Sequence, residues 1–128
     1  MSARRVLHLG KFYPPFAGGV ESFHADLMNA LHRRGLPVAA LVHEHEPWGH
    51  REVATSWPYP VYRARTYGRL LYTPLAPGYR RTLTRAIADF RPELLHLHMP
   101  NPSVFWALSL AAARRLPWLV HWHADVVA

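Results

Sequence analysis

Short apolar runs alternate with segments of helical periodicity along this chain, and the alternation restricts the folds that it can adopt. Short apolar runs predict strands at 4–9, 37–43, 61–65, 94–98 and 118–123, and the runs at 6–9 and 37–43 are typical of buried strands. Apolar residues at helical spacing predict helices at 19–34, 78–90 and 104–115. Strands that alternate with helices form parallel sheets, because each crossover uses a helix. The predicted fold class is therefore α/β, a doubly wound parallel sheet with helices on both faces.

Local signals set the limits of these elements. Gly35 and Pro37 end the first helix, and Ser103 is the predicted N-cap of the helix at 104–115. The strand at 61–65 alternates apolar and basic residues, which suits a sheet edge, and loops are predicted at 44–58 and 66–78. The expected apolar stripes are Val20, Phe23, Leu27 and Leu31 on the first helix, and Tyr79, Leu83, Ala86, Ile87 and Phe90 on the second.

Composition excludes several classes of protein. The chain has 128 residues, of which 50% are hydrophobic and 18% are charged, so one folded domain is expected and disorder is not. No apolar run reaches the roughly 18 residues of a membrane span, and no secretory signal follows Arg4 and Arg5. Cysteine is absent, which excludes disulfides and thiolate chemistry. These features suit a cytoplasmic protein.

The charge balance indicates an anionic partner. Fifteen basic residues against eight acidic ones give a net charge of +7, which attracts phosphates in nucleotide sugars, nucleic acid or anionic lipid. Between residues 63 and 91, arginines are interleaved with tyrosines. This region suits a lipid or nucleic-acid surface, and it equally suits a solvated basic helix face.

The segment from Lys11 to Glu21 is the most informative loop. Prolines at 14 and 15 take the chain out of the sheet, and Gly18 and Gly19 stand at the start of the first helix. Free N–H groups at a helix start favour an anion, and glycines let it approach the backbone closely. A tight turn that packs helix on strand explains the same pattern. The residues alone leave both explanations open.

Several polar residues are expected at one edge of the sheet, because ligands bind beyond the carboxyl ends of parallel strands where the strand order reverses. Ten histidines are present, and two pairs at i, i+2 lie in predicted strands, namely His96 with His98 and His121 with His123. Neighbouring strands then bring His98 near His123, which allows a zinc site. A carboxylate that could serve as the third zinc ligand is not evident. No activated serine motif occurs either. The residues expected at this edge are Gly18, Gly19, His98, Asn101, His123 and Asp125.

Three segments in order resemble the N-terminal domain of family 4 glycosyltransferases, the retaining enzymes of GT-B type. They are Lys11–Glu21 with its aromatic-Pro-Pro and Gly-Gly-Val-Glu, Leu94–Pro102, and Leu119–Val127 with its His-Trp-His-Ala-Asp. The resemblance covers essentially the whole chain. It implies a Rossmann-like domain that forms half of a GT-B fold, with the reaction between it and a second domain.

The resemblance also implies roles for individual residues. Gly18 and Gly19 would lie against the donor diphosphate, and His123 would be the catalytic histidine of the cleft. The remaining residues expected on the acceptor side are Tyr13, His98, Asn101 and Asp125. Same-face attack assisted by the leaving phosphate needs no enzyme nucleophile, and neither metal nor other cofactor is expected.

For the whole chain, residues 1–128, we therefore expect an acceptor-side domain that is incomplete at its C-terminal end and lacks the donor-binding domain. The full enzyme would be a hexosyltransferase that transfers sugar from a nucleotide-diphosphate sugar to a glycan or lipid-linked acceptor, whereas this chain alone would be inactive. An anionic membrane at the inner face is an additional expected partner, and nucleic acid is not expected. The alternatives are a stand-alone nucleotide-binding module of Rossmann-like fold and a basic domain that docks on membrane or nucleic acid.

Overall fold

A computed structural model of the chain describes residues 4–10, 19–43, 53–54, 57–64, 69–70, 73–74, 78–99 and 102–122. The strands are β1 (Val6–Leu9), β2 (Val38–His43), β3 (Val53–Ala54), β4 (Val61–Ala64), β5 (Arg69–Leu70), β6 (Thr73–Pro74), β7 (Leu94–Met99) and β8 (Trp118–Trp122). The helices are α1 (Gly19–Arg33), α2 (Tyr79–Phe90), the 3-10 helix η1 (Pro102–Ser109) and α3 (Ala111–Arg114).

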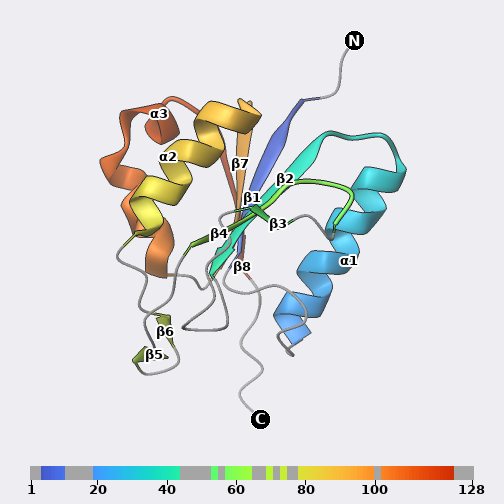
Figure 1. Ribbon diagram of the computed structural model, residues 1–128, viewed down its shortest axis with the longest axis horizontal. Helices are drawn as coiled ribbons and strands as arrows, with labels where there is room; N and C mark the ends of the chain where they lie inside the picture. Colours follow the sequence, from blue (N-terminus) through green and yellow to red (C-terminus); the bar gives the residue numbers. More distant parts are fainter. Residues whose placement is uncertain are drawn as a thin grey trace.

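The main sheet is doubly wound. Its strand order within the described residues is β3-β4-β2-β1-β7-β8, and all neighbouring pairs are parallel except β3 with β4. Helix α1 covers one face, and α2 and α3 cover the other (Figure 1). The chain first winds outward from β1 through β2 to β4, and then returns to the opposite side of β1 for β7 and β8. This arrangement confirms the predicted α/β class with helices on both faces.

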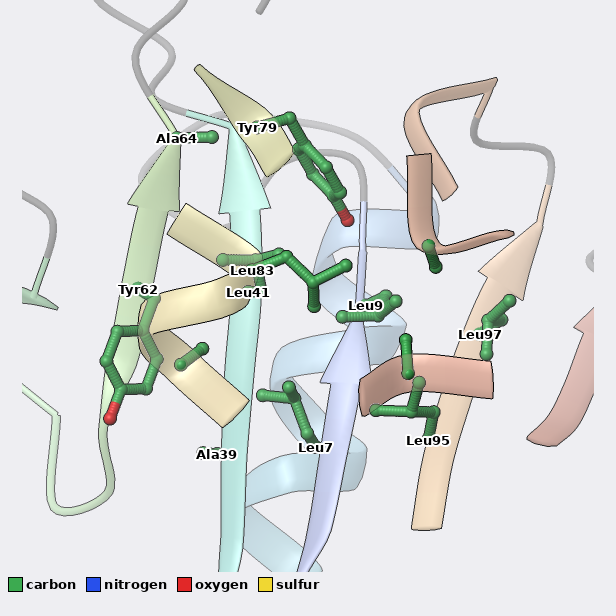
Figure 2. Close-up of a cluster of buried hydrophobic side chains, with 13 residues drawn as sticks. Leu7, Leu9, Ala39, Leu41, Tyr62, Ala64, Tyr79, Leu83, Leu95 and Leu97 are labelled. Atoms are coloured by element: carbon green, nitrogen blue, oxygen red, sulfur yellow. The ribbon is translucent and has the colours of Figure 1, made fainter. Parts of the chain in front are cut away.

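The face beneath α2 and α3 holds the larger apolar core. Leucines alternate along β1 and β7 and point toward α2 together with residues of β2 and β4 (Figure 2). Tyr79 and Leu83 of α2 lie in this core with no exposed surface, and Ile87 and Phe90 pack against it. The predicted apolar stripe of α2 is therefore confirmed.

Helix α1 ends as predicted but turns a different face inward. Gly35 has a φ of 78°, and the N–H groups of Gly35 and Leu36 donate to the carbonyls of His32 and Leu31, a Schellman ending. The buried residues of this helix are His24, Ala25 and Met28, whereas Phe23 is 43% exposed. The predicted stripe is confirmed at Leu31, which packs against the core over β2 and β4, and is wrong at Phe23, because His24 takes the buried position beside it. The side chain of Val20 lies outside the described residues.

Four other predictions need correction. Residues 102–115 do not form one α-helix but η1 followed by the short α3, and Ser103 lies inside η1 instead of capping a helix. The predicted loop at 44–58 contains β3, so β4 is not at the sheet edge. All four residues of β4 are buried, Arg63 included. Finally, β5 and β6 form an antiparallel pair within the predicted loop at 66–78.

The basic region is divided between core and surface. Arg81, Arg85 and Arg91 are exposed, whereas Tyr62 and Tyr79 are buried. These two tyrosines therefore do not share a surface with the exposed arginines, and the exposed arginines fit the solvated basic face. Within the described part of the chain, no helix has the length and apolar character needed to cross a membrane.

Candidate functional site beneath the strand-order reversal

Strands β1 and β7 lie side by side at the point where the strand order reverses, which is where open α/β sheets bind ligands. Their register pairs His8 with His96 and Leu9 with Leu97. Strand β8 continues the sheet beyond β7 and pairs His121 with His98. Three neighbouring strands therefore contribute histidines to one region of the sheet.

These histidines share the face that α1 covers. We call His8, His24, His96, His98 and His121 the histidine cluster. Residues i and i+2 of a strand point to the same side, so His96 and His98 are neighbours while Leu95 and Leu97 point to the apolar core. Helix α1 adds His24, and its Phe23 meets the His121 ring edge-on at 5.4 Å between centroids.

The cluster is compact and buried. His8, His24 and His98 are at most 2% exposed, and His96 and His121 are half-buried. The His24 and His98 rings stack with centroids 4.2 Å apart, and the His96 and His98 rings do so at 4.5 Å. Nδ1 of His8 lies 3.0 Å from Nε2 of His98, a hydrogen bond for which one of the two nitrogens carries the proton.

Burial keeps His8 neutral. Loss of water around its ring lowers the pKa of His8 well below the ordinary 6.5, and the neighbouring His24 and His96 lower it further. Nε2 of His8 has no hydrogen-bond partner among the residues that the structure describes. A neutral imidazole with one unpartnered nitrogen is the form that binds metals or accepts a proton.

A second polar pair lies on the opposite face. Nε2 of His43, the last residue of β2, is 2.7 Å from Oγ of Ser103 in η1, and the His43 ring stacks on Tyr79 with centroids 5.2 Å apart. His43 has no exposed surface and Ser103 has 7%. A serine this deeply buried is not presented to a substrate, so we interpret the pair as a tie between β2 and η1.

The residues expected at the site are only partly described. Gly19 is the first residue of α1, as predicted. His98 is the second-last residue of β7. It points to the α1 face, where it is the centre of the histidine cluster. The other expected residues, Tyr13, Gly18, Asn101, His123 and Asp125, lie outside the described residues.

Sequence patterning missed His8 and His24. A signal for His8 was present, because the triplet Leu-His-Leu occurs at both 7–9 and 95–97, and these triplets pair in register. Nothing in the local pattern of α1 distinguishes His24 from a surface histidine such as His32, since helix rotation was predicted from the apolar residues alone.

The family of the chain follows from a comparison with known domains. The family model of the glycosyl transferase 4-like domain matches residues 18–128. The chain belongs to this glycosyl transferase 4-like family. The match begins at the glycine pair where α1 starts and includes α1 and every later element.

Solved structures show the same fold at low identity. A structure of sucrose-phosphate synthase from Thermosynechococcus elongatus aligns with 94% of the glycosyl transferase 4-like chain at a TM-score of 0.69 and 20% identity. A second structure of that synthase aligns with 94% of the chain at a TM-score of 0.61 and 17% identity. The chain spans 33% of the first of these structures and 64% of the second. None of the curated proteins compared with the chain matches it.

Proposed function

We propose that this chain is the acceptor-side domain of a retaining glycosyltransferase that takes sugar from a nucleotide-diphosphate donor. The observation that carries the proposal is the match of the glycosyl transferase 4-like domain to residues 18–128, together with a doubly wound sheet. Two solved structures of similar fold are those of a sucrose-phosphate synthase, an enzyme named for a sugar phosphate.

The start of α1 supports the donor side of the proposal. Helix α1 begins at Gly19 and follows β1, one of the two strands at the order reversal. The first N–H groups of a helix have no intrahelical partner and favour an anion. We propose that Gly18 and Gly19 approach the donor diphosphate, and that His123 contacts the transferred sugar or the acceptor.

The proposed acceptor is a glycan or a lipid-linked saccharide. Arginines on the exposed side of α2, such as Arg81 and Arg85, give the domain a positive surface that suits an anionic membrane. Transfer is expected from this domain joined to a second, donor-binding domain, and not from the 128-residue chain alone. The reaction as proposed requires no metal and no other cofactor.

Nuclear magnetic resonance of the labelled chain tests the proposal. Millimolar UDP-glucose or GDP-mannose should shift the backbone amide signals of Gly18, Gly19 and the first turn of α1. Uridine and guanosine, which lack phosphate, are the controls and should leave these signals in place. Equal shifts with the nucleosides, or none with any donor, would contradict the proposed diphosphate site.

Calorimetry with UDP and GDP separates the proposal from a stand-alone nucleotide-binding module. Weak millimolar binding or no measurable heat is expected, because this domain would contribute only part of the donor contacts. A micromolar dissociation constant would instead support the stand-alone module.

A further inference from the structure

Three buried histidines from three elements bring ring nitrogens to one place. His8 lies in β1, His24 in α1 and His98 in β7, and one ring nitrogen from each lies within 4.8 Å of the other two. All three side chains are buried. The place lies beneath the strand-order reversal, on the face of the sheet opposite the larger apolar core.

The spacing of these nitrogens is close to that of a metal centre. Zinc–nitrogen bonds of about 2.0–2.1 Å in a tetrahedral site put neighbouring ligand nitrogens about 3.3 Å apart. Nδ1 of His8 lies 3.0 Å from Nε2 of His98, so these two rings are already in contact, although this hydrogen-bonded pair does not include the unpartnered Nε2 of His8. One ring nitrogen of His24 lies within 4.8 Å of the ligand atoms of His8 and His98, so the three nitrogens must move closer together when an ion binds.

The donor set selects a class of ion. Imidazole nitrogen suits zinc, copper, nickel and cobalt, whereas magnesium and calcium require oxygen ligands. Neither group of converging donors within the described residues contains a carboxylate, and the chain has no cysteine. An ion held here would therefore be a divalent transition metal.

His8 has a buried ring nitrogen that makes no hydrogen bond among the described residues. If Nδ1 of His8 donates to His98, its Nε2 presents a buried lone pair; in the other tautomer, Nε2 carries a buried N–H. Either form leaves Nε2 without a hydrogen bond among the described residues, which is unfavourable for a buried polar atom.

We propose that His8, His24 and His98 bind one divalent transition-metal ion, zinc in the first instance, with water or another ligand in the fourth position. The ion joins α1 to β1 and β7 and thereby fixes the start of the helix against the sheet. This proposal is independent of the proposed sugar transfer, in which the ion has no assigned part.

A second group of histidines in the same cluster could bind the ion instead. His96, His98 and His121 also bring ring nitrogens within 4.8 Å of one another, but only His98 of these is fully buried. Because His98 belongs to both groups, its substitution does not distinguish them. His24 and His121 each belong to one group, so their variants decide which group binds.

The test is a zinc titration of the 128-residue chain after dialysis against a chelator, followed by competition with a chromophoric chelator. We expect one zinc ion per chain with a dissociation constant in or below the micromolar range. Cobalt in place of zinc should give the strong visible absorption of a four-coordinate nitrogen site. Failure of the unaltered chain to bind zinc at this stoichiometry would overturn the proposal.

Substitutions assign the ligands. His24→Gln and His98→Gln should weaken zinc binding at least about 100-fold, since loss of mere supporting contacts to a metal ligand already costs 10–100-fold. His121→Gln and His32→Gln are the matched controls and should retain the affinity of the unaltered chain; His32 is an exposed histidine of the same helix as His24. Retention by His24→Gln with loss by His121→Gln would overturn the assignment.

Circular dichroism shows whether each variant folds. If a variant does not fold, a measurement on the unaltered chain still tests the proposal. Long-range proton–nitrogen spectra of the unaltered chain report which histidine nitrogens change on zinc addition. Changes at His8, His24 and His98 support the proposal, and changes confined to surface histidines contradict it.

Discussion

The two faces of the sheet bury different kinds of side chain. Beneath α2, leucines from β1 and β7 pack with Leu83 and Tyr79 into a continuous apolar core (Figure 2). Beneath α1, the same two strands present His8, His96 and His98, and the apolar cluster on that face lies over β2 and β4. The apolar face gains stability from area removed from water, whereas the histidine face depends on each ring finding partners.

The difference shows where polar side chains take positions that apolar residues could fill. His8, His96 and His98 alternate with core leucines in β1 and β7, His24 faces the sheet from α1, and His121 lies on the neighbouring strand β8. Apolar residues there would pack with less dependence on partners and pH. Retaining polar rings beneath the strand-order reversal is therefore better explained by chemistry at this position than by stability.

The largest expected effect is on the apolar face. Leu95→Ala should lower the free energy of unfolding by about 3 kcal/mol, because Leu95 has no exposed surface and its loss leaves a cavity. Urea denaturation measures the change. Leu108→Ala is the matched control, since Leu108 is 51% exposed and should change the free energy by less than about 0.5 kcal/mol. Equal losses for the two variants would contradict the position of this core.

On the histidine face, Gly10→Ala should cost about 2 kcal/mol by overpacking. A Cβ at position 10 would lie 2.5 Å from Nδ1 of His24 and 2.6 Å from its Cε1. Thermal unfolding measures the loss. Gly78→Ala is the control, because a Cβ there meets nothing within 4 Å, and it should be close to neutral. A neutral Gly10→Ala would show that His24 does not pack against β1.

Acid should weaken the histidine face. Because the pKa of His8 is lowered in the folded chain, the unfolded chain binds more protons below pH 6.5, and stability falls as the pH falls. Between pH 6.5 and 5 this single group accounts for a loss of up to about 2 kcal/mol. Unfolding of chelator-treated protein at several pH values measures it. His8→Gln should flatten this pH dependence, and an unchanged slope in that variant would contradict burial of a neutral His8.

The smallest effect has the opposite sign. The Tyr79 hydroxyl is buried without a hydrogen-bond partner among the described residues, and burial raises the pKa of Tyr79. Tyr79→Phe should therefore be neutral or stabilise the chain by about 1 kcal/mol, because it removes an unsatisfied polar group from an apolar core. Denaturant unfolding measures the change. A loss above about 1 kcal/mol would show that the hydroxyl has a partner in the folded chain.

The sequence predicted the fold well because its signals are local. Runs of apolar residues and stop signals such as Gly35 located the strands β1, β2, β4, β7 and β8 and the helices α1 and α2 to within a few residues. The family resemblance is confirmed by the match to residues 18–128. Prediction failed for η1, where alanine and leucine favoured an α-helix although Ser103 is hydrogen-bonded to His43 at the end of β2.

The histidine cluster could not be predicted from the sequence, for a different reason. Its members lie up to 113 residues apart, from His8 to His121, and they meet only through strand register and the rotation of α1. The i, i+2 pairs indicated which strands carry histidines. They did not indicate that His8 would face His96, because strand order is a property of the whole sheet. The proposed roles of Gly18, Gly19 and His123 remain predictions.

The close approach of Gly10 to His24 has a consequence for how relatives of this domain are compared. Every other amino acid carries a Cβ, so any inherited change at position 10 moves the His24 ring. Selection would then retain glycine there in every lineage that keeps the histidine, whatever its sugar substrate. An invariant glycine at position 10 would report side-chain packing, and it should not be counted with the glycine pair at 18 and 19 as evidence for a bound phosphate.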